Sequence, residues 1–185
     1  MTSVVLIRHG ETDWNVEGRY QGQADPPLNK KGFEQAKTLA ENLLSFELNL
    51  LFTSPLKRAK KTAEIIAEKN NLPIIEEPRF MEIHQGDWQT RLRSEIERIY
   101  PELFKKWETE PWNVTPPNGE HLNQVKERVL DGLNDAVNSY PGKKIGVVTH
   151  RIPISLIKME FQDLDPDIVR TIQLPNTYYE KIEIR

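Results

Sequence analysis

Cysteine is absent from this chain of 185 residues, and no apolar run reaches the length of a membrane-spanning helix. The lack of cysteine excludes disulfides, zinc–thiolate sites and a cysteine nucleophile. It is compatible with a cytoplasmic protein, and this is the compartment that we expect. No basic segment with a following apolar stretch precedes the first predicted strand, so we expect no secretory signal. We also expect no membrane partner.

A marked excess of charge of either sign is also missing. The chain has 25 Lys and Arg residues against 28 Asp and Glu residues, and its net charge is −3. Nucleic-acid-binding proteins usually carry a basic excess, so we expect no nucleic-acid partner, although one basic pocket in an acidic protein is compatible with this charge. Since we find no repeat, linker or low-complexity tract, the length predicts one domain over residues 1–185.

Apolar runs of strand length alternate with stretches of helical periodicity. Buried strands are predicted over 4–7, 48–53 and 144–149, with a short strand over 74–75 and an edge strand over 178–184. Helices are predicted to begin near Asn29, at Ser54–Pro55, near Asn118 and just before Pro153, with one or two more over 91–107, interrupted near Pro101. Residues 13–27, 80–88 and 111–119 are predicted to be loops. This alternation predicts an α/β fold with three layers, in which a mostly parallel central sheet carries helices on both faces.

Two of the predicted buried strands end in histidine. Arg8 and His9 follow the first strand, and His150 follows the strand at 144–149. The carboxyl ends of parallel strands meet at one edge of the sheet, where ligands bind in open α/β folds. Arg58 lies in the first turn of a predicted helix, where a cation opposes the helix dipole. It is therefore better suited to hold an anion than to stabilise its helix, although a solvated arginine among lysines is an equal alternative at this point.

This constellation would gather two imidazoles and two guanidiniums around one point. A phosphoryl group is the natural occupant, because planar arginine donors match its oxygens two at a time. Metal binding is the competing use of clustered histidines, but adjacent cations would repel a metal ion, and neither an HExxH motif nor an acidic cluster is present. A Walker A motif is absent too. We therefore expect no metal and no cofactor.

Several sequence blocks, in order, carry a family resemblance. They are 6–12 (LIRHGET) with Asn15, 21–28 (QGQADPPL), Gly32 with 35–36, 54–59 (SPLKRA) with 62–63, Glu82 with 86–88 (GDW), 118–120 (NGE) and 147–150 (VVTH). Together they span nearly the whole chain, and the sequence resembles the histidine phosphatase (phosphoglycerate mutase-like) superfamily.

This resemblance implies a mechanism that the residues can support. His9 would attack the phosphorus of a phosphomonoester and form a phosphohistidine intermediate, which water then cleaves. Arg8, Arg58 and His150 would hold the phosphoryl oxygens. The two arginines would also disfavour the imidazolium form of His9, which must be neutral to attack. Glu82 matches the general acid of the family, and this role requires a raised pKa.

The same resemblance gives Asn15, Gln21 and Gly22 as residues that line the phosphate and the near part of the substrate. Arg151 departs from the family pattern, which usually has glycine after the second histidine. It would either crowd the pocket or contact a second anionic group of the substrate.

Two further departures from the pattern affect the rim of the pocket. Gln89–Thr90 replaces the usual Glu-Gly, and His121 stands where serine is common. His84 and His121 are interpreted as structural or substrate-lining residues.

The sequence thus predicts a metal-independent phosphomonoesterase that acts on a small phosphorylated metabolite. One alternative is a cofactor-dependent phosphoglycerate mutase, although the longer insertions of the family's mutases are missing. Another is a catalytically silent module that binds a phosphorylated ligand or a protein, for which Arg151 is the best support. The sequence leaves the substrate open, and it is compatible with a monomer or a homodimer.

Overall fold

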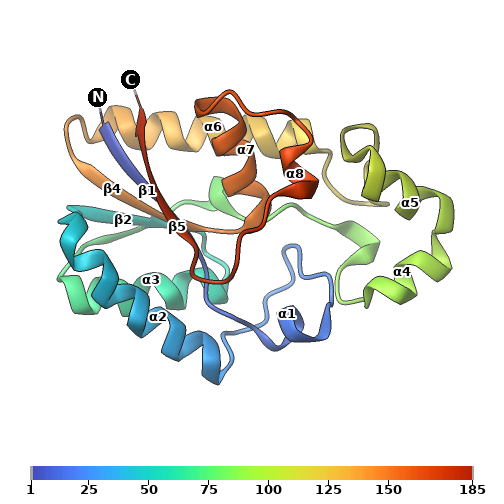
Figure 1. Cartoon of the computed structure of the whole chain (residues 1–185), viewed down its shortest axis with the longest axis horizontal. Helices are drawn as coiled ribbons and strands as arrows, with labels where there is room; N and C mark the ends of the chain where they lie inside the picture. The colour runs from blue at the N-terminus through green and yellow to red at the C-terminus, as the bar shows by residue number, and fades with distance from the viewer. Residues whose placement is uncertain (1, 185) are drawn as a thin grey trace.

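A five-stranded sheet forms the centre of the computed structural model, which describes residues 2–184 (Figure 1). The strands lie in the order β3-β2-β4-β1-β5. Neighbours among the first four pair in parallel, and β5 pairs antiparallel with β1 at the edge of the sheet. Their bounds are β1 Thr2–Arg8, β2 Leu50–Thr53, β3 Ile74–Glu76, β4 Lys144–Thr149 and β5 Tyr179–Ile184. The predicted α/β class with a mostly parallel sheet is therefore confirmed.

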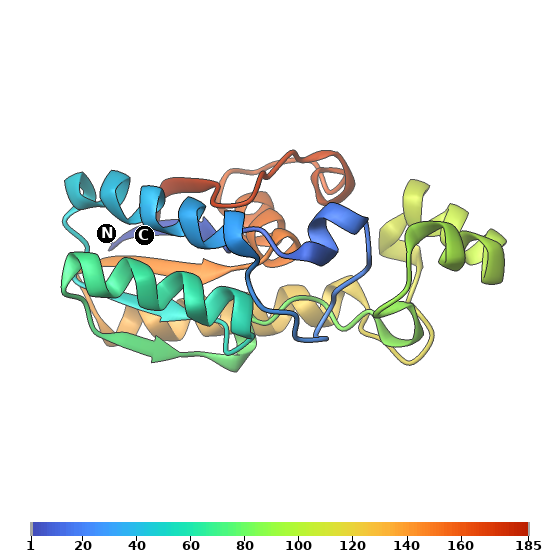
Figure 2. The same ribbon diagram turned by 90° about the horizontal axis from the view of Figure 1, so that it is seen from below.

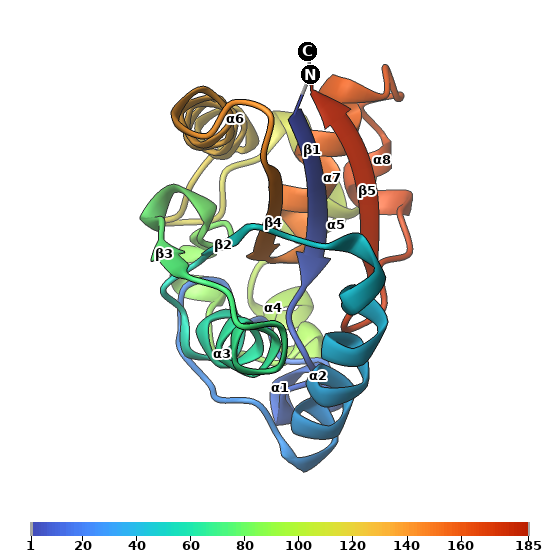
Figure 3. The same cartoon turned by 90° about the vertical axis from the view of Figure 1, so that its left-hand side faces the viewer.

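Helices cover both faces of this sheet (Figure 3). On one face lie α2 and α3, and on the other lie α6 and α7, whereas α4 and α5 project beyond one end of the sheet (Figure 2). The helices are α1 Asp13–Glu17, α2 Lys30–Asn42, α3 Lys57–Asn70, α4 Arg93–Ile99, α5 Pro101–Thr109, α6 Leu122–Ser139, α7 Arg151–Phe161 and α8 Ile168–Thr171. Short 3-10 turns cover Leu43–Phe46, Pro78–Phe80, Gly86–Trp88 and Pro111–Asn113. In the part of the chain described, no helix combines the length and apolar character needed to cross a membrane.

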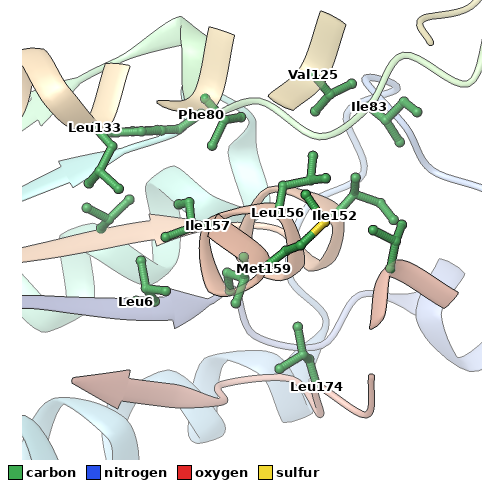
Figure 4. Close-up of a cluster of buried hydrophobic side chains, with 14 of the residues drawn as sticks. Leu6, Phe80, Ile83, Val125, Leu133, Ile152, Leu156, Ile157, Met159 and Leu174 are labelled. Carbon is green, nitrogen blue, oxygen red and sulfur yellow. The ribbon is translucent and has the colours of Figure 1, made fainter. Parts of the chain in front are cut away.

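The apolar run of β1 divides between two cores. Val4 and Leu6 belong to the core under α6 and α7, and Val5 and Ile7 belong to the core under α2 and α3. Side chains alternate between the faces of a strand, so a strand covered on both sides reads as a continuous apolar run. Figure 4 shows the first core, in which Leu6 lies near the apolar side chains of α7. This double burial holds the carboxyl end of β1 in a fixed position.

Local capping interactions place some helices differently from the sequence predictions. The segment 13–27 contains α1, which a capping box between Thr12 and Asn15 supports. Helix α3 begins at Lys57 after Leu56 rather than at Ser54–Pro55. Helix α6 begins at Leu122, and the side chain of His121 caps it by accepting from the backbone N–H of Asn123. The short helix α8 was not predicted, whereas the break at Pro101 and the cap at Asn29 are confirmed.

The connections define where a ligand pocket can form. The chain leaves β1 towards α2 on one face, and it leaves the adjacent β4 towards α7 on the other face. Neighbouring parallel strands whose connections diverge in this way open a crevice at their carboxyl ends, where ligands bind in α/β folds. His9 follows β1 and His150 follows β4, so both histidines lie at this point.

Candidate active site

The two histidines face each other at the carboxyl edge of the sheet. Their ring centroids are 5.1 Å apart, and both side chains are almost fully buried. The strands fix this spacing, because the backbone N–H of His9 donates to the carbonyl of Thr149 at 3.1 Å. The structure therefore brings together the two histidines that the sequence pattern singled out.

A hydrogen bond fixes which ring nitrogen of His9 is available. Nδ1 lies 2.7 Å from the carbonyl oxygen of Gly10, which can only accept, so Nδ1 carries the proton and Nε2 keeps a lone pair. Burial lowers the pKa of His9 well below its ordinary value, and the charges of Arg58 and Arg8 lower it further. His9 is therefore a neutral imidazole with an unprotonated Nε2 at pH 7, which is the form that a nucleophile requires.

His150 is neutral for the same reasons. Burial lowers its pKa well below the ordinary value, and Arg58 adds to the effect. Its Nε2 lies 2.8 Å from the hydroxyl oxygen of Ser54, which follows β2 at the same edge of the sheet. Within residues 2–184, Nδ1 of His150 has no hydrogen-bond partner.

Arg58 is buried rather than solvated, with only 1% of its surface exposed. Its guanidinium donates to the carbonyl of Gly22 at 2.7 Å and to that of Ala24 at 2.9 Å, which anchors the loop over the pocket. Arg8 donates to the carbonyl of Leu174. Burial lowers the pKa of each arginine to about 10, so both remain cations at pH 7.

Each of these arginines has a buried N–H donor that makes no hydrogen bond within residues 2–184. Among the described residues, the Nε atoms of Arg8 and Arg58 are buried and have no hydrogen-bond partner. Buried donors are satisfied in nearly all proteins, so donors without partners at one edge of a sheet indicate a site for an acceptor ligand. Their positive charge selects an anion.

Glu82 completes the charged group of residues. Its carboxylate accepts from the backbone N–H of Ile83 at 2.9 Å, and its second oxygen lies 3.5 Å from the N–H of Ile152 in the first turn of α7. Desolvation raises the pKa of Glu82, against the opposing effects of these N–H groups and the charge of Arg58. This carboxyl group can therefore hold a proton at a higher pH than a surface glutamate, as an acid catalyst needs.

Arg128 of α6 holds the segment that carries Glu82. Its guanidinium donates to the carbonyls of Arg79 and Met81, both at 2.7 Å, and to that of Glu82 at 3.0 Å. It also pairs with Glu120, whose carboxylate accepts from the N–H of His84. One side chain thus holds three backbone carbonyls of the short segment 79–82.

Asn15 lies in α1, and Gln21 and Gly22 lie in the loop that Arg58 anchors. The hydroxyl oxygen of Thr12 is 3.1 Å from Oδ1 of Asn15 and 3.0 Å from Oε1 of Gln21. Gly22 has φ +52° and its carbonyl accepts from Arg58. The structure therefore links all three to the histidine pocket through Thr12 and Arg58.

Arg151 is the first residue of α7, next to His150. Its charge lowers the pKa of Arg8 and of Glu82, which places it beside the same group of residues. By contrast, Nδ1 of His84 accepts from the N–H of Gly86, and His121 caps α6 with its Nε2 2.8 Å from the carbonyl oxygen of Trp112. Both rings therefore have structural hydrogen bonds of their own.

Besides Arg128, the sequence patterns missed two residues that hold this site. Ser54 was predicted to cap a helix, but α3 begins later; the Ser54 hydroxyl accepts from the N–H of Leu56 and contacts His150. Its position after a buried strand was a usable signal, since β2 and β4 are neighbours. Nδ2 of Asn176 donates to the carbonyl of His9 and to Oδ1 of Asn15. Asn176 lies in a loop with no periodicity, and nothing in the sequence indicated its role.

Comparison with known proteins agrees with this geometry. The sequence profile of the histidine phosphatase superfamily (branch 1) matches residues 4–185. The chain therefore belongs to the histidine phosphatase superfamily, and it is a phosphatase of the phosphoglycerate mutase-like fold.

Individual relatives lie within the same family. Phosphoserine phosphatase 1 of Hydrogenobacter thermophilus is 41% identical over 154 residues, which cover 83% of this chain and 73% of the relative. A probable phosphoglycerate mutase GpmB of Cronobacter sakazakii is 32% identical over 99% of this chain and 85% of the relative. The structure of Bacillus stearothermophilus YhfR superposes with a TM-score of 0.94 at 34% identity, over 100% of this chain and 92% of that one.

Proposed function

We propose that this chain hydrolyses small phosphomonoesters through a phosphohistidine on His9, without a metal ion. The observation that carries the proposal is the neutral ring of His9, whose free Nε2 lies among buried cations with unused donors. Phosphoryl transfer depends mainly on positioning and on stabilisation of spread negative charge, and this pocket supplies both.

In the first step, Nε2 of His9 attacks phosphorus and the bond between phosphorus and the ester oxygen breaks. Arg8, Arg58 and His150 hold the phosphoryl oxygens, and the carboxyl group of Glu82 gives its proton to the leaving alkoxide. In the second step, the Glu82 carboxylate takes a proton from water, which attacks phosphorus and breaks the P–N bond. Inorganic phosphate leaves, His9 is neutral again and Glu82 is again protonated.

The residues themselves support a reaction without metal. No group of three or more His, Cys, Asp or Glu side chains with the spacing of a metal site exists between residues 2 and 184. Arg8 and Arg58 supply fixed positive charge. A metal ion makes the same contribution to stabilising phosphoryl oxygens in metal-dependent enzymes.

The test is hydrolysis of p-nitrophenyl phosphate in the presence of EDTA, by the wild type and by His9→Ala. We expect turnover by the wild type, none by the variant, and an acid-labile phosphate on His9 when the wild type is quenched during turnover. Loss of wild-type activity in EDTA would contradict the metal-independent mechanism. Undiminished turnover by a folded His9→Ala variant would contradict the nucleophile.

Mutase activity is the second candidate, because one relative is named a probable phosphoglycerate mutase. A mutase would interconvert phosphoglycerates and would depend on a bisphosphate primer. The more identical relative is named a phosphoserine phosphatase, so phosphoserine is the first natural substrate to assay. A silent binding module would turn over no phosphomonoester at all.

A further inference from the structure

A small pocket lies at the N-terminal end of α7, lined in part by the two residues that follow His150. Its volume is about 210 Å³, and the polar side chains that line it are those of Tyr20, Glu108, Arg151 and Arg170. Trp107 and Ile152 contribute apolar walls. We call this cavity the α7 pocket.

Two residues that line the α7 pocket directly follow His150 in the chain. His150, Arg151 and Ile152 are consecutive, and the N–H of Ile152 lies 3.5 Å from the carboxylate of Glu82. The charge of Arg151 lowers the pKa of Arg8 and of Glu82, so the guanidinium at the α7 pocket lies close to the charged groups of the phosphoryl site.

Most charges at the α7 pocket are already paired. Arg170 forms an ion pair with Asp167, and Glu108 forms one with Arg93. Arg151 differs: across residues 2–184 no carboxylate lies within 4.0 Å of its guanidinium. That guanidinium has a weak hydrogen bond of 3.2 Å to the carbonyl of Arg170. Four of its five N–H donors thus remain for a ligand.

The place of Arg151 in the fold favours the same interpretation. It is the first residue of α7, an eleven-residue helix, and it therefore lies at the positive end of the helix dipole. A cation there costs stability, whereas an anion at that place is stabilised by both the dipole and the guanidinium. Tyr20 adds a hydroxyl donor, because burial raises its pKa to about 12 and keeps it protonated.

We propose that the α7 pocket holds a carboxylate of the substrate, bound by Arg151, so that the preferred substrates are small phosphorylated acids. This inference rests on the proposed function and narrows its substrate class. The size of the pocket agrees, since pockets that bury drug-sized ligands have volumes of roughly 300–1,000 Å³. A pocket below this range suits a substrate whose part beyond the phosphate has only a few carbon atoms.

The test compares substrates that differ only in the carboxylate. One pair is 3-phosphoglycerate and glycerol 3-phosphate, and the other is phosphoserine and phosphoethanolamine. We expect the wild type to have the higher kcat/KM for the acid in each pair. Arg151→Gln should reduce this ratio by roughly 10- to 100-fold, the effect of losing a hydrogen bond to a charged group. Arg151→Lys should retain part of the ratio.

Arg98→Gln is the matched control, because Arg98 is an exposed arginine of α4 that does not line the α7 pocket. Arg98→Gln should leave the ratio of kcat/KM for the acid to kcat/KM for its partner unchanged in both substrate pairs. A wild-type ratio near one in both pairs, or a ratio that Arg151→Gln does not alter, would overturn the carboxylate site even if the variant is otherwise active. In either case, His9-dependent turnover of p-nitrophenyl phosphate would show that the proposed function stands and only the substrate class is wrong.

Discussion

The rings of His9 and His150 lie 5.1 Å apart with their planes inclined at 57°, and the charges of Arg8 and Arg58 act on both. In water each imidazole would be partly protonated near pH 6.5. Here burial and the two guanidiniums prevent this, so the pocket has fixed positive charge and two uncharged rings. A phosphoryl group would meet a nucleophile and its counter-charges without any prior proton transfer.

The lowered pKa values of the two histidines predict that the free energy of unfolding falls as the pH is lowered. The pKa values of His9 and His150 are lowered by folding, so below about pH 6.5 the unfolded chain binds more protons than the folded chain. Their contribution to stability is complete above pH 6.5 and is lost as the pH falls. Each histidine contributes a slope of up to about 1.4 kcal/mol per pH unit. Urea unfolding at pH 7.5 and at pH 5.5 measures this change in the free energy of unfolding.

His150→Asn provides the comparison for this measurement. Glu82, whose pKa is raised, contributes a slope of opposite sign in both proteins, so the difference between them isolates the histidine. We expect the variant to lose less stability than the wild type between the two pH values. An equal or larger loss would mean that His150 is protonated in the folded protein.

The second prediction concerns Glu82 and the leaving group. Glu82→Gln cannot supply a proton, so release of an alkoxide should slow by about 10²- to 10⁴-fold, the usual contribution of general acid catalysis. p-Nitrophenolate needs no proton to leave, so its release in the first turnover should slow much less. Rapid-quench measurement of the first turnover on p-nitrophenyl phosphate and on phosphoserine tests this. Equal loss on both substrates would mean that Glu82 has a different role.

Much of this site could be predicted from the residues that directly follow the predicted strands. His9 and His150 follow buried apolar runs, so the sheet itself brings them together. Arg58 could be selected because a cation in the first turn of a helix is unfavourable unless it binds something. Residues whose role depends on irregular segments could not be found in this way. Arg128 donates to carbonyls of the segment 79–82, and Asn176 lies in the loop between α8 and β5. No periodicity of the sequence encodes the course of either segment.

The third prediction concerns two reasons for glycine at position 22: its positive φ and the lack of space for a Cβ. Gly22 and Gly18 both have positive φ, and alanine in the left-handed region costs roughly 1–2 kcal/mol at either position. A Cβ at Gly18 would meet nothing within 4 Å, whereas one at Gly22 would lie 2.4 Å from Oε1 of Gln89. That oxygen accepts from the N–H groups of Gln23 and Gln85, so both bonds would be disturbed.

Gly22→Ala should therefore cost more stability than Gly18→Ala and should also lower kcat, because the carbonyl of Gly22 positions Arg58. Gly18→Ala should lower stability only. Thermal unfolding together with steady-state kinetics on p-nitrophenyl phosphate distinguishes the two. Equal kinetics for both variants would mean that the loop does not position Arg58 for the reaction.

The last prediction assigns Arg128 to the positioning of Glu82. Arg128→Lys keeps the charge but loses the planar fork that reaches the carbonyls of Arg79, Met81 and Glu82. Turnover of phosphoserine should fall by roughly 10- to 100-fold, with a smaller effect on the first turnover of p-nitrophenyl phosphate, because only the former needs a well-placed acid. Lys126→Met is the control, since Lys126 lies on the same helix and pairs with Glu160 at the surface. If Arg128→Lys slowed both substrates equally, or if the control behaved in the same way, the effect would come from the stability of α6 rather than from Glu82.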